Sequence, residues 1–280
     1  MSRLALLAAA AALLSVPAQA DVLRHCAPPP ELSAAQQDRL FRFAALVQGE
    51  LQASGHRVAL VARAGLDLQR FGQRDSHAGV SLLASPNTPW SVRQLYFDCD
   101  AGQPRLFDQG LPGFVLGGAS PEQGHVVAWL LPDAAALPLE AAALNNAEAL
   151  RLLGAQYSAN AFAWSTAYQN CNQWVAELLA RAWGGASADG GADPRASAQR
   201  WLRAQGYTPT RITVASPLVM LAGALLPWLH TRDHPADAVQ RQQFDISLPA
   251  SIEAFVRQQV PGARRIEFCH DQQQMVVRHG

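Results

Sequence analysis

The chain has 280 residues, which is enough for one ordinary domain or one domain with a modest appendage. Its 22 basic residues balance 22 acidic ones, and every basic residue is an arginine because the sequence contains no lysine. Balanced charge argues against nucleic-acid binding, which needs a clustered cationic face. With 49% apolar and 16% charged residues, the chain is too hydrophobic to be intrinsically disordered.

The first twenty residues have the three-part pattern of a secretory signal peptide. Arg3 supplies a positive start, residues 4–14 form an apolar run too short to span a bilayer, and residues 18–20 read Ala-Gln-Ala, which signal peptidase accepts. A buried N-terminal helix is the alternative. We expect cleavage after Ala20, a mature chain in the periplasm or outside the cell, and no transmembrane span in it.

Hydrophobic periodicity and turn residues predict the elements of the first half of the chain. In chain order these are a helix over 32–54, a strand over 58–62, a hairpin with strands at 76–83 and 90–97, a strand over 125–131 and a helix over 134–153. The hairpin is indicated by a Pro- and Asn-rich turn between its two strand-like runs.

The second half begins with the clearest helical pattern, over residues 170–183, which Asn170 can cap. After it we expect a linker over 184–193, a helix capped by Asp193, a helix over 251–259 and a closing hairpin of 265–269 with 275–278. The apolar stretch 214–229 is short and interrupted by two prolines, so we expect a buried helix there rather than a membrane segment. The order of the predicted helices and strands along the chain favours an α+β fold over a doubly wound sheet.

Cys171 and His77 are the residue pair with the strongest chemical interpretation. Cys171 stands in the first turn of the predicted helix 170–183, where unpaired backbone N–H groups lower a thiol pKa and can bind an oxyanion. His77 stands on the predicted strand 76–83, which can hold an imidazole against such a helix. Cysteine hydrolases need a thiol nucleophile and an imidazole base.

The segments around both residues resemble those of papain-like thiol hydrolases. Residues 76–80, Ser-His-Ala-Gly-Val, resemble the small-His-x-Gly-aliphatic strand of NlpC-type enzymes. Residues 170–174, Asn-Cys-Asn-Gln-Trp, resemble the Asn-Cys-x-x-aromatic helix start of their circularly permuted branch. That branch includes the lecithin retinol acyltransferase group, and in it the histidine precedes the cysteine. The resemblance covers about residues 62–183 and implies that Cys171 is the nucleophile and His77 the base.

The resemblance also implies an architecture, which is an antiparallel sheet packed on helices. We therefore expect four parts: a signal peptide over residues 1–20, a papain-like α+β core over 21–183, a Gly-rich linker over 184–193, and a smaller C-terminal α+β extension over 194–280 that packs on the core.

A third polar residue is implied on the strand that follows the histidine. Counting across the turn around Asn87 places residues 96–98 near His77, so Asp98 is the first candidate to orient the imidazole and Gln94 the second. The residues expected to contact substrate are Tyr157, whose hydroxyl could bind an oxyanion, Asn170, Trp174 and Gln94.

Most of the mature chain, from about residue 32 to the end, also resembles the uncharacterised bacterial domain-of-unknown-function family 2145. The segments that carry this resemblance are residues 74–79, 168–174, 233–235 and 248–255. It implies a secreted or periplasmic protein and supplies no activity.

The four cysteines leave alternatives open for Cys171. In an exported protein Cys26, Cys99, Cys171 and Cys269 could form two disulfides with three possible connectivities. If Cys171 is free, a Cys26–Cys99 or a Cys99–Cys269 disulfide can still form. The free Cys171 could also be an inert buried thiol. His77 could be a hydrogen-bonded strand histidine with no chemical role.

No metal or cofactor is expected. His230 and His234 flank Asp233, but prolines bracket the cluster and Arg232 lies inside it, so a role in anchoring a loop is the stronger interpretation. Cys269 and His270 have no second ligand pair at zinc-site spacing. No phosphate-binding Gly loop or Gly-x-Ser-x-Gly turn is present.

The sequence thus leads to two main hypotheses of different classes, and an envelope metal-binding protein is a third alternative. The first is a secreted thiol hydrolase or acyltransferase that acts on an amide or ester bond of a cell-wall (peptidoglycan) peptide or a lipid, without a cofactor. The second is a non-catalytic envelope binding or assembly protein in which Cys171 is structural or disulfide-bonded.

Overall fold

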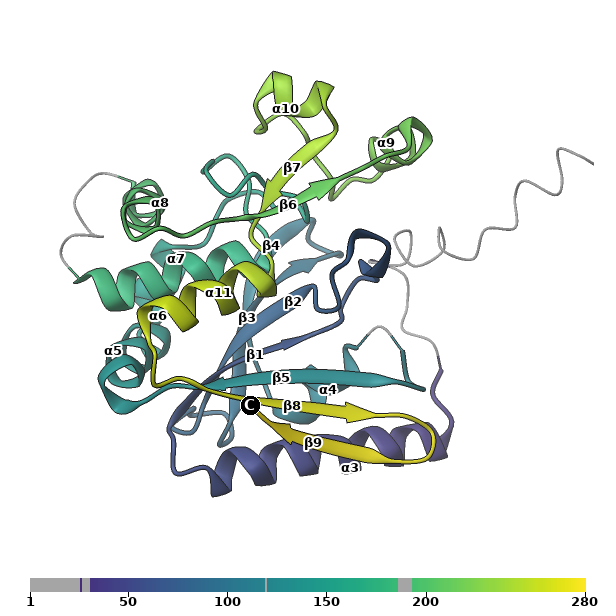
Figure 1. Ribbon diagram of the computed structural model, residues 1–280, viewed down its shortest axis with the longest axis vertical. Coiled ribbons are helices and arrows are strands. Elements are labelled where there is room, and N and C mark those ends of the chain that lie inside the picture. The colour runs from purple at the N-terminus through teal and green to yellow at the C-terminus, as the bar shows by residue number, and fades with distance from the viewer. Residues whose placement is uncertain (1–25, 27–30, 119, 186–192) are drawn as a thin grey trace, which may run out of the picture. The chain divides into compact units, whose positions relative to one another are not determined.

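The computed structural model of the protein describes residue 26 and residues 31–118, 120–185 and 193–280. The predicted signal peptide and most of the predicted linker lie outside the described residues. The chain divides into two units, residues 1–31 and residues 32–280, and the fold below is that of the second unit. It is α+β, as predicted, and is built on an antiparallel sheet (Figure 1).

The sheet has seven strands in the order β4-β3-β2-β1-β5-β8-β9, and every neighbouring pair is antiparallel. The central strands β1, β2 and β5 are mostly buried along their length, which agrees with their runs of β-branched and apolar residues. The strand bounds are β1 Val58–Arg63, β2 His77–Leu82, β3 Ser91–Asp98, β4 Gln103–Gln109, β5 Gly124–Leu130, β8 Arg264–His270 and β9 Met275–His279.

One face of the sheet is covered by α3 (Ala34–Ala53) and the short α4 (Leu111–Leu116) (Figure 1). Helix α3 starts at a capping box, in which the Ser33 hydroxyl accepts from the Gln36 N–H and the Gln36 side chain accepts from Ser33. Its buried residues join those of α4, β1, β3, β5 and β8 in one hydrophobic cluster.

Helix α7 (Cys171–Gly184) covers the other face, where it contacts β2 and β3. Helix α5 (Asp133–Leu144) packs beside it, followed by α6 (Asn146–Arg151). The sequence predicts one helix over 134–153, and the structure has two because Asn145 leaves the helical conformation. The Asn145 side chain then accepts hydrogen bonds from the Ala147 and Glu148 N–H groups as the cap of α6.

The C-terminal part of the chain returns to the main sheet. Helices α8 (Pro194–Ala204) and α11 (Pro249–Gln259) pack on α7, and the predicted closing hairpin is β8–β9, which pairs with β5. Asp193 caps α8, as predicted. A separate two-stranded sheet consists of β6 (Thr210–Thr213) and β7 (Gln243–Ile246), with α9 (Pro217–Gly223) and α10 (Ala236–Gln240) between them.

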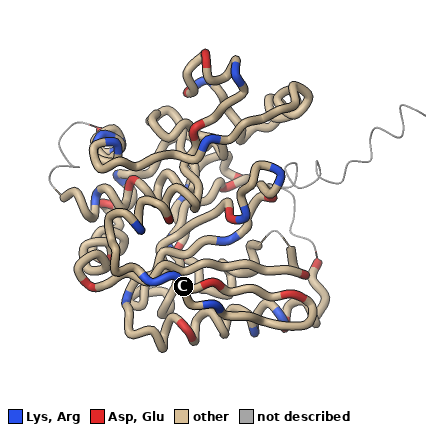
Figure 2. Tube along the Cα trace, in the orientation of Figure 1, with Lys and Arg blue, Asp and Glu red and all other residues tan. Residues whose placement is uncertain are grey.

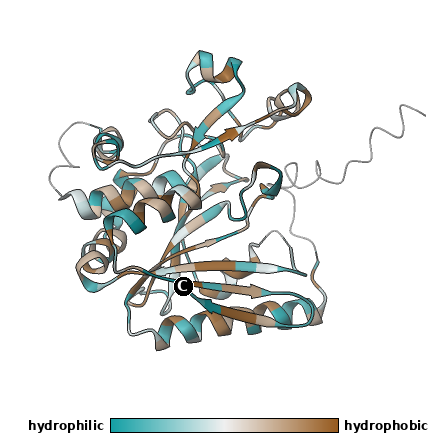
Figure 3. Ribbon diagram, viewed as in Figure 1, coloured by the Kyte–Doolittle hydropathy of each residue, from teal (hydrophilic) through white to brown (hydrophobic). Residues whose placement is uncertain are grey.

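The prediction of a buried core helix over residues 214–229 is wrong. Only the short α9 forms there, none of its residues is buried, and Leu218, Leu221 and Leu225 are 73%, 63% and 80% exposed. Pro217 and Pro227 confine the helix to two turns, which is too short to lie along the core. Figure 2 shows α9 without charged residues and Figure 3 shows its apolar character. In the described part of the chain, no helix has the length and apolar character needed to span a bilayer.

Candidate functional site

Cys171 is the first residue of α7, and its sulfur lies against the strand that carries His77. Asn170 caps the helix, because its Oδ1 accepts from the Gln173 N–H at 2.7 Å. The Cys171 Sγ is 4.0 Å from the carbonyl oxygen of Ser76, and the backbone N–H of Ala78 also points to it. The Asn172 side chain donates to the same Ser76 carbonyl at 2.9 Å, which fixes the helix start on β2. The sulfur therefore contacts the backbone on either side of His77.

The ring of His77 is held by the neighbouring strand. Its Nε2 lies 2.7 Å from Gln94 Oε1, and Gln94 in turn donates to Gln109 Oε1 on β4 at 2.9 Å. Since Oε1 is only an acceptor, the imidazole donates from Nε2. Of the two candidates for the orienting residue, the structure brings Gln94 to the histidine.

Asp98 lies elsewhere. It is four residues beyond Gln94, about 13 Å along the strand. Its carboxylate accepts from the Asp100 and Ala101 N–H groups and pairs with Arg105 at 3.1 Å, which stabilises the β3–β4 turn.

Gly79 permits the contact between His77 and Gln94. A Cβ at position 79 would lie 2.4 Å from Val92 Cγ1 and 3.2 Å from Gln94 Cβ. The absence of a side chain at Gly79 thus lets β3 come close enough for the Gln94 amide to reach the imidazole.

Burial determines the pKa of the Cys171 thiol, contrary to the lowered pKa expected from its place in a first turn. The residue is only 7% exposed, and this burial raises its pKa to about 11, although the N–H of Asn172, the charge of Arg63 and the N–H of Ala78 act in the opposite direction. The resting residue at neutral pH is therefore a protonated thiol. A group that accepts the proton is needed for it to act as a nucleophile.

Tyr157 lies in the electrostatic environment of Cys171. Its ring stacks on Phe97 with centroids 5.2 Å apart, and burial, with smaller effects of Cys171 and Tyr96, raises its pKa well above the usual value. The phenol is neutral and is able to donate a hydrogen bond.

Asn170 and Trp174 were expected to contact substrate, and the structure gives both of them structural contacts. Besides capping α7, Asn170 donates to the carbonyls of Ala159 and Ser247, each at 3.3 Å. Trp174 is fully buried and donates from Nε1 to the Ala149 carbonyl at 3.2 Å. Both residues hold α7 in place.

Cys26 and Cys99 are disulfide-bonded, whereas Cys171 and Cys269 are free. The alternative in which Cys171 is part of a disulfide therefore does not apply to this structure. The two interpretations of Cys171 that remain are a nucleophilic thiol and an inert buried thiol.

A family model described as "Uncharacterized protein conserved in bacteria (DUF2145)" matches residues 50–256, which is well over half of the chain. The chain belongs to DUF2145. Comparisons with curated proteins and with solved structures find no match. The family match includes the strand of His77 and the helix of Cys171, and it ends before β8.

Arg63 is a residue of the DUF2145 chain that sequence analysis missed. It is 3% exposed, and no carboxylate of the described residues pairs with it. Its guanidinium donates to the Tyr96 hydroxyl and the Gly117 carbonyl and lies over the Phe114 ring. Tyr96 in turn stacks on His77 with ring centroids 4.7 Å apart. Arg63 thereby supplies a buried positive charge next to the Cys171–His77 region.

The His230–His234 segment anchors a loop in this DUF2145 chain, as predicted. His234 Nε2 lies 2.7 Å from the carbonyl oxygen of Asn160, and Asp233 Oδ2 accepts from the Phe162 N–H at 2.8 Å. These contacts connect two loops near the start of α7.

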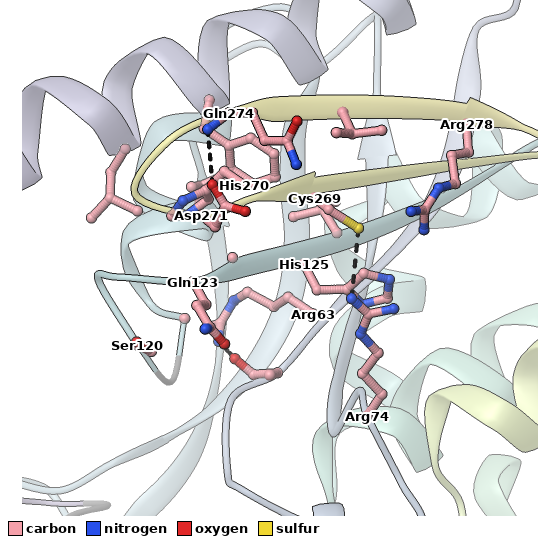
Figure 4. Close-up of a pocket in the computed structure, with 18 of the residues that line it drawn as sticks. Arg63, Arg74, Ser120, Gln123, His125, Cys269, His270, Asp271, Gln274 and Arg278 are labelled. Atoms are coloured by element: carbon pink, nitrogen blue, oxygen red, sulfur yellow. Dashed lines mark hydrogen bonds between the residues drawn. The ribbon is translucent and has the colours of Figure 1, made fainter.

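A cavity of about 380 Å³ lies at the end of β5, and none of the residues predicted as the site lines it (Figure 4). Polar side chains from four segments line it, namely Arg63, Gln69, Arg74, Ser120, Gln123, His125, Cys269, His270, Asp271, Gln274 and Arg278. These segments are far apart in the sequence, so no local motif could have indicated the cavity.

Proposed function

We propose that this protein is a thiol hydrolase or acyltransferase in which Cys171 attacks an amide or ester carbonyl. The observation that carries the proposal is the position of the Cys171 sulfur, at the first turn of a helix and against the backbone on both sides of a histidine. The strand with its histidine, the helix with its cysteine, and a polar residue on the strand after the histidine agree with the permuted NlpC-type arrangement.

The raised pKa of Cys171 requires a mechanism in which the thiol loses its proton during the attack. Because the Nε2–H of His77 donates to Gln94, Nδ1 carries the lone pair that takes the proton from Sγ. The sulfur then forms a bond to the carbonyl carbon, and the carbonyl electrons move to the oxygen. The imidazolium returns its proton to the leaving amine or alcohol as the C–N or C–O bond breaks. Water, or an acceptor alcohol or amine, then cleaves the thioester.

The oxyanion formed in this attack needs hydrogen-bond donors. The backbone N–H groups of Cys171 and Asn172, in the first turn of α7, have no helical partner and point to the Cys171 sulfur, beside which the oxyanion would form. Tyr157 adds a neutral hydroxyl in the same region, and Arg63 adds a buried positive charge. We assign these three groups to stabilisation of the developing negative charge.

The proposed substrates are a cell-wall peptide or a lipid ester, which the resemblance to NlpC-type enzymes and to the acyltransferase group implies. We place the protein in the periplasm or outside the cell, since disulfide-bonded Cys26 and Cys99 fit an oxidising compartment. The exposed leucines of α9 favour a lipid ester, because this apolar surface is followed along the chain by the loop whose His230 stacks on Tyr168, three residues before Cys171.

Turnover of a panel of lipid esters and muropeptides tests the proposal. The wild-type protein and the Cys269→Ser variant should hydrolyse a member of one class, whereas Cys171→Ala and His77→Ala should lose about 10²-fold or more. If the Cys171→Ala variant keeps wild-type turnover, the proposal is wrong.

The alternative is an envelope binding protein in which Cys171 is structural, and the high pKa and small exposure of this thiol are the observations that favour it. In that case Cys171→Ala should lower the free energy of unfolding without changing any turnover. Urea unfolding of the variant, measured beside its activity, separates the two functions.

A further inference from the structure

Three side chains with metal-binding atoms converge on the open face of β5 and β8. His125 pairs directly with Cys269 across these antiparallel strands, and Glu267 is two residues before Cys269, so all three lie on one face. The imidazole, carboxylate and thiol ligand atoms all lie within 4.8 Å of one another. Glu267 Oε1 is 3.0 Å from His125 Nε2 and 3.7 Å from Cys269 Sγ.

The orientation of His125 is fixed by a second carboxylate. Asp75 Oδ1 lies 2.7 Å from His125 Nδ1, while Glu267 occupies the other side of the ring. Both ring nitrogens of His125 thus face a carboxylate oxygen, and the one at Nε2 belongs to Glu267, the second candidate ligand. A carboxylate on the other nitrogen of a histidine is also the usual support of a metal-bound imidazole.

We propose that His125, Glu267 and Cys269 form a site for a divalent transition metal such as zinc. A tetrahedral zinc ion has ligands at about 2.0 Å for nitrogen and oxygen and about 2.3 Å for sulfur, so its ligand atoms lie roughly 3.3–3.7 Å apart. The separations of 3.0 and 3.7 Å are close to that requirement. The mixed nitrogen, sulfur and oxygen set excludes calcium and magnesium, which take oxygen ligands.

The guanidinium of Arg74 lies where the metal would bind. It lies 2.8 Å from Glu267 Oε1 and 3.6 Å from Cys269 Sγ, so one cation already bridges two of the three ligands. Figure 4 shows the contact of Arg74 with Cys269. The Arg74 side chain is 56% exposed, and it can swing into solvent at little cost. Arg265 pairs with the other oxygen of Glu267, at 3.0 Å, whereas Arg278 lies 3.9 Å from Oε1 with a 64% exposed side chain that can move aside like that of Arg74. Binding therefore exchanges the Arg74 guanidinium for the ion and releases the thiol proton of Cys269.

The cavity gives the ion access and a place for a fourth ligand. His125, Cys269 and Arg74 line it together, and Figure 4 shows them at one end of the 380 Å³ space. Three protein ligands and an open position are the arrangement of zinc sites that bind water or a small molecule. The site does not include Cys171 or His77, so it is independent of the function proposed above.

Titration of the purified full-length protein with Co²⁺ tests the site, because a cobalt–thiolate bond gives a charge-transfer band in the near ultraviolet. The wild type should show this band at one equivalent, and Zn²⁺ should abolish it. Cys269→Ser should remove the band, His125→Ala should weaken binding at least tenfold, and Arg74→Ala should strengthen it severalfold. Cys171→Ser, which removes the other free thiol, is the matched control and should keep the band.

Thermal unfolding of each apo variant verifies that it is folded. A wild-type protein without the band, or a band that persists in Cys269→Ser, overturns the proposal. If Arg74→Ala leaves the affinity unchanged or lowers it, the exchange of guanidinium for metal is wrong.

Discussion

The Nε2 atom of His77 lies 2.7 Å from Oε1 of Gln94, so a neutral amide, and not a carboxylate, orients the imidazole. An amide oxygen fixes the tautomer and the ring plane, but it stabilises an imidazolium less than a carboxylate does. The base strength of His77 therefore depends on the residue at position 94.

Two substitutions of Gln94 should affect activity in different ways. Gln94→Ala leaves the ring without its partner and should lower kcat about tenfold or more, because His77 is then less often in the productive orientation. Gln94→Glu should raise the pKa of His77 and move the acidic limb of the kcat/KM profile to higher pH. The pH–rate profiles of the three proteins provide the measurement, and coinciding profiles for wild type and Gln94→Glu would contradict the assigned role.

Gly79→Ala should destabilise the fold as well as the site. The added Cβ would lie 2.4 Å from Val92 Cγ1, and relief of this overlap pushes β3 away from β2 at a cost of about 1–3 kcal/mol. Gly49→Ala is the matched control, because Gly49 lies within α3 with no atom within 4 Å of its Cβ position, and alanine favours the helix by about 0.5–1 kcal/mol. Urea unfolding should shift in opposite directions for the two variants.

The two free thiols should react with iodoacetamide at different rates. Cys269 is partly exposed and lines the cavity, whereas Cys171 is buried and its pKa is raised to about 11. Peptide mapping at pH 7.5 should show Cys269 modified first. Because the thiolate is the reactive form, alkylation of Cys171 should still accelerate between pH 9 and pH 11. A Cys171 rate that levels off below pH 8 would contradict the protonated resting state.

The raised pKa of Cys171 also has a consequence for stability. The folded protein keeps this proton at a pH where the unfolded chain, with a thiol pKa near 9, has lost it. The contribution to stability is present below about pH 9 and is lost as the pH rises to about 11. Cys171→Ser should therefore reduce the alkaline loss of stability in that range, as measured by thermal unfolding at stepped pH.

Glu267 should contribute to stability over an acidic range. Its partial burial acts to raise the pKa, but hydrogen bonds from Arg265 and His125, together with their charges, outweigh this and lower it to about 2. Because the pKa in the folded state is below that of the unfolded chain, the contribution is complete above about pH 4.5 and is lost as the pH falls to about 2. Glu267→Gln should flatten the pH dependence of stability in this interval, and an unchanged dependence would contradict the role of Glu267.

Local signals in the sequence were sufficient for several parts of the fold. The cap at Asn170, the turn before β3 and the apolar runs of β1 and β5 each depend on a few neighbouring residues, and the structure confirms them. The contact of Gln94 with His77 was found only as a second choice, because strand register depends on the length of the turn and on the close approach at Gly79.

Features that depend on long-range pairing could not be predicted. His125, Glu267 and Cys269 meet only because β5 pairs with β8, strands that are about 140 residues apart, so no spacing rule applies to them. The exposure of α9 was also missed, since hydrophobicity alone does not tell a core helix from an apolar helix on the surface.

The central claim is that Cys171 is a nucleophile activated by His77, and the mass of an acyl adduct tests it most directly. After a short incubation with a 4-nitrophenyl acyl ester at pH 7.5 and an acid quench, peptide mapping should find the acyl group on Cys171 of the wild type. The His77→Ala variant should acylate this residue at least 10²-fold more slowly. Acylation confined to Cys269, or an equal rate at Cys171 without His77, would contradict the account.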